Sequence, residues 1–468
     1  MGKHSARLLA AVTAAVAACA LAPGGTGSAG GATHAAAGPG TRLWLSRFSS
    51  AQGTSDAPAS MAVSPGGRRV FVTGFSAGNA PGDFGDYATV AYDAQTGARL
   101  WARRYNGPGK GTDLATSVAV SPSGTMVFVT GSSMRNGSVS DYATIAYNAA
   151  TGALLWVRRF GPGGASAVTA GRDGRVFVTG SSLGDFATVA YRAATGTRLW
   201  VTRYDGPGHG FDDAASLALS PGAATLFVTG RSGDGQPVSA DDYATVAYRA
   251  RTGAQRWATR FHGAATGTDG ARSVVVSPPG GRVFVTFVTG DRRGAAPQND
   301  YATAAYRAAS GAPLWVRRYN GPANGWDDAS SLAASPAGSM VFVTGVSDRT
   351  PETADMATVA YSAAGARLWV RRYAGPGRHG AAGISVATGP GGRTVFVTGI
   401  TTAGHFATVA YRAASGAWLW ARRYNGPGQG DDVPAAVAAS PAGSRVFVTG
   451  RSPGTASADD FATLAYRS

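Results

Sequence analysis

The sequence predicts an all-β protein, an eight-bladed β-propeller built from four-stranded antiparallel blades. Two phrases support this prediction, because each recurs eight times in the same order along the chain. VFVTG or a close variant starts at 70, 127, 176, 226, 283, 341, 395 and 446, and DYATVAY or a variant starts at 86, 141, 185, 242, 300, 355, 405 and 460. The second phrase returns about every 53 residues, which fits one four-stranded blade per unit.

Each unit contains four short segments rich in β-branched and aromatic residues and bounded by Gly, Pro, Ser or Asp, as is typical of strands. In the second unit they are ATSVAVS (115–121), VFVTG (127–131), DYATIAYN (141–148) and LLWVRRF (154–160), here called strands A, B, C and D. The A–B and C–D connections are short turns, whereas the D–A and B–C loops are longer. The antiparallel order places both long loops on one face of the disc, where binding residues usually lie.

The two ends of the repeat region predict how the ring closes. The chain stops at AYRS (465–468), halfway through an eleven-residue phrase that is complete as AYDAQTGARLW at 91–101. The missing half, TRLW, stands at 41–44. We therefore expect strand 42–48 to pair with strand 460–467, so that both termini complete the eighth blade.

One unit departs from the regular pattern. The fifth unit reads VFVTFVTG at 283–290, an apparent duplication of three residues. Because side chains alternate between the two faces of a strand, an odd insertion would reverse their facing. We therefore expect a bulge or an extended loop at this position.

The N-terminal region differs in composition from the repeats. Residues 1–22 combine basic residues with a short apolar run, which is typical of a secretory signal peptide and too short for a membrane span. Cys19 is the only cysteine and ends a lipobox-like tetrad, so it is a candidate for lipidation; alternatively, it is lost with a signal cut further along. Residues 23–40 indicate a flexible tether and 41–468 the propeller. We expect a protein that is secreted or attached to the outer face of the cell envelope.

The chain is basic, with 42 Lys and Arg against 26 Asp and Glu and a net charge of +16. Such a charge can indicate nucleic-acid binding. Here, however, an arginine stands three residues after a tryptophan in every unit, so the repeat spreads the charge around the disc. Charged outer strands also protect sheet edges from aggregation. We favour this role and expect no nucleic-acid partner.

The eleven-residue phrase also carries a resemblance to a known family. AYDAQTGARLW is similar to the tryptophan-docking pattern A-x-D-x-x-T-G-x-x-x-W of quinoprotein alcohol dehydrogenases and other PQQ-like eight-bladed propellers, and the VFVTG phrases resemble SBBP-type bacterial propeller repeats. The resemblance covers residues 41–468 and implies that one tryptophan per unit packs between blades. These tryptophans are Trp44, Trp101, Trp156, Trp200, Trp257, Trp315, Trp369 and Trp420.

The same resemblance raises the question of enzyme activity, because the family's dehydrogenases hold PQQ and Ca²⁺. The chain has a single glutamate, Glu352, and its aspartates recur in register instead of gathering in one unit. Calcium needs several converging oxygen ligands. Because the sequence offers no unique set of acid, base and metal ligands, we predict a non-catalytic protein without PQQ, calcium or another metal.

A few polar side chains at the starts of strands remain as weak candidates on the long-loop face. They are Asp113, Asp141, Asp213, Asp242, His379 and His405. For the aspartates we favour capping of their own loops, and the alternative is a ring of carboxylates that binds cations or basic partners. The two histidines belong to one unit, and His405 replaces the usual Asp, but no HxH, HxxxH or HExxH spacing supports a metal site.

These observations predict an exported, non-catalytic and monomeric propeller scaffold. It would bind a protein or a cell-surface polymer through its long D–A and B–C loops. Two alternatives stay open, a PQQ- and calcium-dependent dehydrogenase-like enzyme and a propeller lipoprotein that assists outer-membrane assembly.

Overall fold

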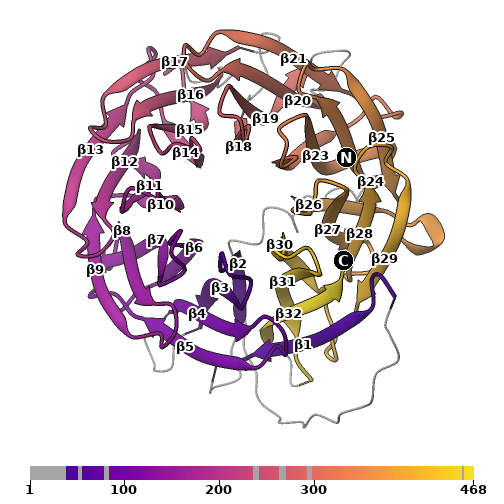
Figure 1. Cartoon of the computed structure of the whole chain (residues 1–468), viewed down its shortest axis with the longest axis horizontal. Helices are drawn as coiled ribbons and strands as arrows, with labels where there is room; N and C mark the ends of the chain where they lie inside the picture. Colours follow the sequence, from indigo (N-terminus) through magenta and orange to yellow (C-terminus); the bar gives the residue numbers. More distant parts are fainter. Residues whose placement is uncertain are drawn as a thin grey trace.

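A computed structural model describes residues 38–50, 55–77, 84–235, 242–262, 270–291, 298–455 and 458–468. Its strands form eight four-stranded sheets, arranged as the blades of a closed ring (Figure 1). The predicted signal peptide with Cys19, and most of the predicted tether 23–40, lie outside the described residues. Within the described part of the chain, no helix is long and apolar enough to span a membrane.

The strands run in chain order around the ring. Blades 1 and 2 contain β2 (Asp56–Val63), β3 (Arg69–Ser76), β4 (Asp86–Asp93), β5 (Arg99–Tyr105), β6 (Asp113–Val120), β7 (Met126–Asn136), β8 (Val139–Asn148) and β9 (Leu154–Phe160). Blades 3 and 4 contain β10 (Gly164–Ala170), β11 (Arg175–Ser182), β12 (Asp185–Arg192), β13 (Arg198–Tyr204), β14 (Asp212–Leu219), β15 (Thr225–Ser232), β16 (Asp242–Arg249) and β17 (Gln255–Phe261).

The second half of the ring repeats the arrangement. Blades 5 and 6 contain β18 (Gly270–Val276), β19 (Arg282–Asp291), β20 (Gln298–Arg307), β21 (Pro313–Tyr319), β22 (Asp327–Ala334), β23 (Met340–Thr350), β24 (Thr353–Ser362) and β25 (Arg367–Tyr373). A 3-10 turn, η2 (Pro376–Arg378), precedes blade 7. Blades 7 and 8 contain β26 (Ala381–Thr388), β27 (Thr394–Thr401), β28 (Phe406–Arg412), β29 (Trp418–Tyr424), β30 (Val433–Ala439), β31 (Arg445–Pro453), β32 (Asp459–Arg467) and β1 (Arg42–Phe48).

Within each blade the strands follow the predicted antiparallel order A–B–C–D, as in β2-β3-β4-β5. Strand A lies nearest the ring axis and strand D at the outer rim (Figure 1). The order places the A–B and C–D turns on one face, called the turn face below, and the D–A and B–C loops on the other, called the long-loop face.

The hydrophobic core lies between neighbouring blades. One cluster joins Phe71 and Trp101 of blade 1 to Val127 and Ile145 of blade 2, all buried. The middle strands are buried on both faces, because each blade packs against a neighbour on either side. In β4, with the sequence DYATVAYD, every residue except the last is buried. The ring therefore supplies each blade with the packing surface that one sheet lacks.

The predicted closure is confirmed. Strand β1 pairs antiparallel with β32, with Trp44 opposite Ala465 and Phe48 opposite Phe461. The N-terminal strand thus becomes strand D of blade 8, and β32 starts one residue earlier than predicted, at Asp459.

At residues 283–290 we expected a bulge or an extended loop, and the bulge is wrong; the loop at 292–297 lies outside the described residues. Strands β19 and β20 pair without a register shift from Arg282 opposite Arg307 to Asp291 opposite Gln298. The extra residues lie at the loop end of the hairpin and lengthen both strands, so the side chains before them keep their facing. Phe287 occupies the position that glycine holds in the other seven blades, as at Gly74, and is fully buried with its ring 4.0 Å from that of Tyr243.

Candidate functional site

On the turn face, every blade contacts the next through the same tryptophan arrangement. Trp101 Nε1 donates a hydrogen bond to the carbonyl oxygen of Ala149 at 3.2 Å. Its ring covers Gly152, which has a φ of 69° and where a Cβ would lie 2.7 Å from the ring. The equivalent bonds of Trp44, Trp156, Trp200, Trp257, Trp315 and Trp369 measure 2.8 to 3.2 Å. The ring of Trp420 covers Gly40, so in each of the eight seams a tryptophan covers a glycine of the next blade.

On the long-loop face, the aspartate that begins strand A holds the D–A loop in place. Asp113 accepts hydrogen bonds from the backbone amides of Gly107 and Met134. Asp56, Asp212, Asp327 and Asp432 each accept a hydrogen bond from the amide six residues earlier, at 2.6 to 2.8 Å. The expected capping of its own loop therefore describes Asp113.

The capping residue in blade 4 is Asp212 and not Asp213, because neighbouring residues of a strand face opposite sides. Asp212 is buried, whereas Asp213 is exposed. The sequence does contain a signal that separates them, since the cap follows the loop glycine by six residues, as in Gly107–Asp113 and Gly206–Asp212.

Burial makes these capping carboxyl groups weak acids. Loss of hydration raises the pKa of Asp56 and of Asp327 to about 6, although hydrogen bonds from the nearby backbone and serine hydroxyls act in the opposite direction. The same cause raises the pKa of Asp113, Asp212 and Asp432. These carboxyl groups are buried and hold the loops through their backbone amides.

The aspartate that begins strand C has a different role. Asp141 pairs with Arg159 of strand D at 3.2 Å, and Arg159 also donates hydrogen bonds to Ser133 and to Tyr105 of the preceding blade. The equivalent pairs are Arg47–Asp460, Arg104–Asp86, Arg203–Asp185, Arg260–Asp242 and Arg372–Asp355, at 2.8 to 3.8 Å. The capping interpretation is therefore wrong for Asp141 and Asp242, whose carboxylates are neutralised by arginines. The arginines of these pairs therefore join side chains within and between blades, in addition to protecting the sheet edges.

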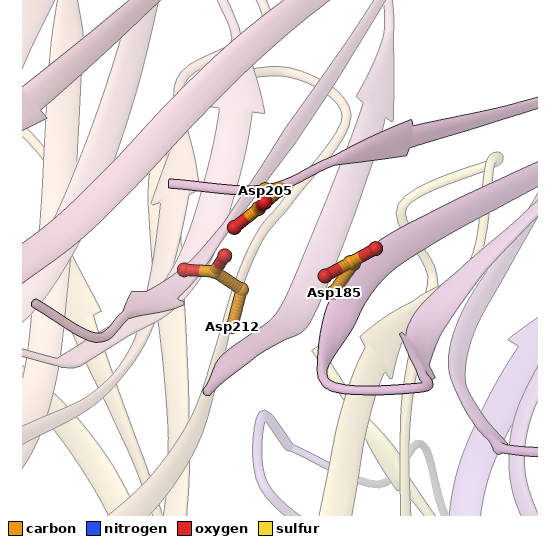
Figure 2. A group of neighbouring side chains, drawn as sticks. All are labelled: Asp185, Asp205 and Asp212. Carbon is orange, nitrogen blue, oxygen red and sulfur yellow. The ribbon is translucent and has the colours of Figure 1, made fainter. Parts of the chain in front are cut away.

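At the seam of blades 3 and 4, three carboxylates come together. Oxygen atoms of Asp185, Asp205 and Asp212 lie within 4.8 Å of one another (Figure 2). Asp205 stands where three other D–A loops have Asn, at Asn106, Asn320 and Asn425. Arg203 is 3.8 Å from Asp185, longer than the distance in any of the five other pairs named above. Sequence reasoning missed this group, because it considered the two aspartates of one blade and not those of adjacent blades.

The three carboxylates do not form a complete calcium centre. Ca²⁺ takes six to eight oxygen ligands, and this group offers three carboxylates. The Nδ1 atom of His209 lies 2.6 Å from Asp205, and this hydrogen bond raises the pKa of His209. One carboxylate is thus already bound to an imidazole and another is near a guanidinium.

The strands nearest the axis carry few charged side chains. They are made mostly of Ala, Ser, Val and Thr, as in β10 (GASAVTA) and β30 (VPAAVAA). In the described A strands, the charged side chains are the aspartate caps, Asp213, and the Arg272–Asp328 pair at 3.4 Å between blades 5 and 6. The residues that face the axis therefore do not fit PQQ with a calcium ion.

Blade 7 lacks the Arg–Asp pair. His405 takes the place of the aspartate and Thr401 that of the serine, and the hydroxyl of Thr401 donates to the carbonyl oxygen of His405 at 3.4 Å. Arg423 is exposed and has no hydrogen-bond or ion-pair partner among the described residues. His379 is exposed in the preceding loop, and neither histidine belongs to a group of three metal-binding side chains in the described ranges.

Solved structures with the same fold include an alcohol dehydrogenase and a propeller solved with a bound protein segment. The quinohemoprotein alcohol dehydrogenase from Comamonas testosteroni is 14% identical, with a TM-score of 0.54 over 91% of this chain and 76% of that one. The Dos1 propeller is 10% identical, with a TM-score of 0.57 over 91% and 94%. Chaetomium thermophilum Sqt1, solved bound to the N-terminus of ribosomal protein L10, is 13% identical, with a TM-score of 0.57 over 90% and 98%. These identities establish a shared fold only.

No curated protein matches the chain. Two segments, residues 28–157 and 86–337, match the sequence model of a family described as outer membrane protein assembly factor BamB. Together they span more than half of the 468 residues. The chain therefore belongs to this family of PQQ-like propellers.

Proposed function

We propose that the protein is an exported, non-catalytic and monomeric propeller that binds a protein or a cell-surface polymer through its long-loop face. The observation that carries this proposal is the contrast between the faces. All eight seams are alike on the turn face, whereas the long-loop face differs from blade to blade. A rigid scaffold with varied loops on one face is the usual arrangement of a binding protein.

The absence of catalysis in this proposal is supported by the chemistry of the polar groups. The strand-A aspartates bind loop amides and most strand-C aspartates bind arginines, so these carboxylates already have structural partners. The protein-binding propeller Sqt1 has the same fold and supports a protein as the more favoured partner class. We propose no nucleic-acid partner, no PQQ and no calcium.

Cross-linking capture from the native cell surface tests the proposal. In one variant, short Gly-Ser turns replace the B–C loops between β3 and β4, β15 and β16, and β19 and β20. The D–A loops keep their length, because their amides bind the buried aspartates, and only their exposed side chains are changed to Gly or Ser. We expect the captured partners of the wild-type chain to be lost.

The matched control changes the opposite face. The A–B turn at 64–68 (SPGGR) is exchanged for the sequence of 121–125 (SPSGT), a turn of equal length. This variant should capture the same partners as the wild type. If the loop variant also captures them, the long-loop face is not the binding face.

The family match favours a second candidate, an assembly factor anchored to the envelope by a lipid on Cys19. In this case the propeller would bind components of an outer-membrane assembly complex with the same face. Radiolabelled palmitate should then enter the wild-type protein and not a Cys19→Ala variant. Failure of the wild type to take up the label would remove the anchor on which this candidate depends.

A further inference from the structure

Blade 7 departs from the arginine network that joins the other blades. In blade 6, Arg372 binds Asp355 at 2.9 Å, the hydroxyl of Ser347 at 2.7 Å and that of Tyr319 in blade 5 at 2.8 Å. The equivalent arginine of blade 7 is Arg423. In blade 7 the equivalent aspartate and serine are replaced by His405 and Thr401. The guanidinium of Arg423 therefore lacks both of the partners that Arg372 finds within its own blade.

The consequence is an arginine on the surface. Arg372 is partly buried, whereas Arg423 is exposed at the long-loop end of β29. Burial raises the pKa of Tyr373 in blade 6, and the positive charge of Arg423 acts in the opposite direction. A guanidinium that gains nothing from its own blade is available for a carboxylate of another molecule.

Tyr373 is also arranged differently from its equivalents. Tyr319 packs against Tyr301 of its own blade, with ring centroids 5.3 Å apart, but the corresponding residue beside Tyr373 is Met356. Tyr373 instead contacts Trp418 of blade 7, with the centroids 5.8 Å apart. Trp418 begins β29 and Arg423 lies near its other end, so Tyr373 of blade 6 and these two residues of blade 7 stand along the same seam.

Trp418 is an exposed side chain at this seam. Its side chain is 52% exposed, whereas the eight seam tryptophans are buried or half-buried. The equivalent positions in the seven other blades hold Arg42, Arg99, Leu154, Arg198, Gln255, Pro313 and Arg367. A tryptophan occurs at this place in blade 7 alone among the described blades.

We propose that this outer flank of the blade 6–7 seam, formed by Tyr373, Trp418 and Arg423, is a docking site for an acidic peptide segment of a protein partner. Trp, Tyr and Arg are the residues enriched at the energetic centres of protein interfaces. The chain's net charge of +16 favours an acidic partner. In the bound state a carboxylate of the peptide pairs with Arg423 and an apolar side chain packs on Trp418. This inference rests on the proposed binding function and specifies the chemistry of the partner.

Binding of defined peptides to the purified full chain tests the site. The probe is a fluorescent octapeptide of alternating Glu and Leu, followed by anisotropy at low and at physiological salt. The control peptide has Gln in place of each Glu. We expect saturable binding of the Glu peptide that weakens with salt, and at least tenfold weaker binding of the Gln peptide.

The most specific variant rebuilds the missing ion pair without changing the site residues. His405→Asp combined with Thr401→Ser gives Arg423 the partners that Arg372 has in blade 6, so affinity for the Glu peptide should fall at least tenfold. Arg423→Ala and Trp418→Ala should each weaken binding to a similar extent. The control is Arg367→Ala, which removes an equal charge from the exposed start of β25 and should leave affinity unchanged.

Three results would overturn the inference. They are no saturable binding by the wild type, equal losses in Arg423→Ala and Arg367→Ala, and binding of polygalacturonate that is stronger than that of the Glu peptide. The last would indicate an acidic polysaccharide instead of a peptide. The loop exchanges of the capture experiment leave β25 and β29 intact, so the two proposals can fail separately.

Discussion

The two faces of the disc show opposite degrees of regularity. On the turn face, each tryptophan covers a glycine of the next blade in all eight seams. On the long-loop face, the Arg–Asp pairs vary from 2.8 Å at Arg47 to 3.8 Å at Arg203, and blade 7 has none. In a repeat protein, features shared by every copy explain how the ring holds together. Features confined to one copy show where to look for function.

Two exceptions on the long-loop face lie on opposite sides of the ring. The group of Asp185, Asp205 and Asp212 lies at β12 to β14, and Arg423 is at the end of β29 (Figure 1). One place has more acids than arginines and the other has an arginine without an acid. The charge distribution of the disc therefore lacks the eightfold symmetry that its backbone nearly has.

The largest expected effect comes from the turn face. Trp156→Ala should lower the free energy of unfolding by about 3–5 kcal/mol, because it removes a buried ring and leaves a cavity between blades. Urea unfolding followed by circular dichroism measures the loss. Trp418→Ala is the control and should cost far less, because that ring is half exposed. Similar losses for both would mean that the seam tryptophans are not the contacts that hold the blades.

The buried caps of the long-loop face should make stability depend on pH. Asp327 has a pKa of about 6 when folded and an ordinary value of 3.8, so the folded chain keeps this proton more readily than the unfolded chain. Stability from this group is therefore full below pH 4 and is lost as the pH rises to about 6. As the pH rises from 4 to 6, the free energy of unfolding of Asp327→Asn should increase relative to that of the wild type by up to about 3 kcal/mol. A constant difference between the two proteins in urea melts would show that the carboxyl group is not protonated on folding.

Restoring regularity at blade 7 should give a smaller, positive effect. His405→Asp supplies the acid that Arg423 lacks, and a pair of this kind should stabilise the chain by about 0.5–1 kcal/mol. Thermal unfolding at low and high salt would detect it, and the gain should shrink at high salt. Asp355→His, the reverse change in blade 6, should destabilise the chain.

The smallest expected effect is that of PQQ with calcium. A ligand that binds only the folded chain raises its melting temperature. Because the strands near the axis do not fit this cofactor, its addition should leave the melting temperature unchanged. A clear rise, or PQQ-dependent reduction of a dye by the purified protein, would support the enzyme alternative.

The sequence was sufficient to predict the ring, its closure and the place of the long loops, because these depend on repeated strands and turns. It was insufficient where neighbours in space are distant in sequence. The partners of Arg159 come from three strands, and one of them, Tyr105, lies in the preceding blade. The choice between Asp212 and Asp213 depended on a single-residue register. The replacement of an aspartate by His405 likewise removes a partner of Arg423, and this could be seen only from the pairing of strands β27 to β29.

The central claim is that the arginine after the seam tryptophan is structural in the regular blades and free in blade 7. The most direct test compares the unfolding of Arg159→Ala and Arg423→Ala, two identical changes at equivalent positions. Arg159→Ala should cost about 2 kcal/mol, because it leaves the buried carboxylate of Asp141 without one of its partners. Arg423→Ala should leave the unfolding midpoint unchanged. Equal losses in the two variants would contradict the account.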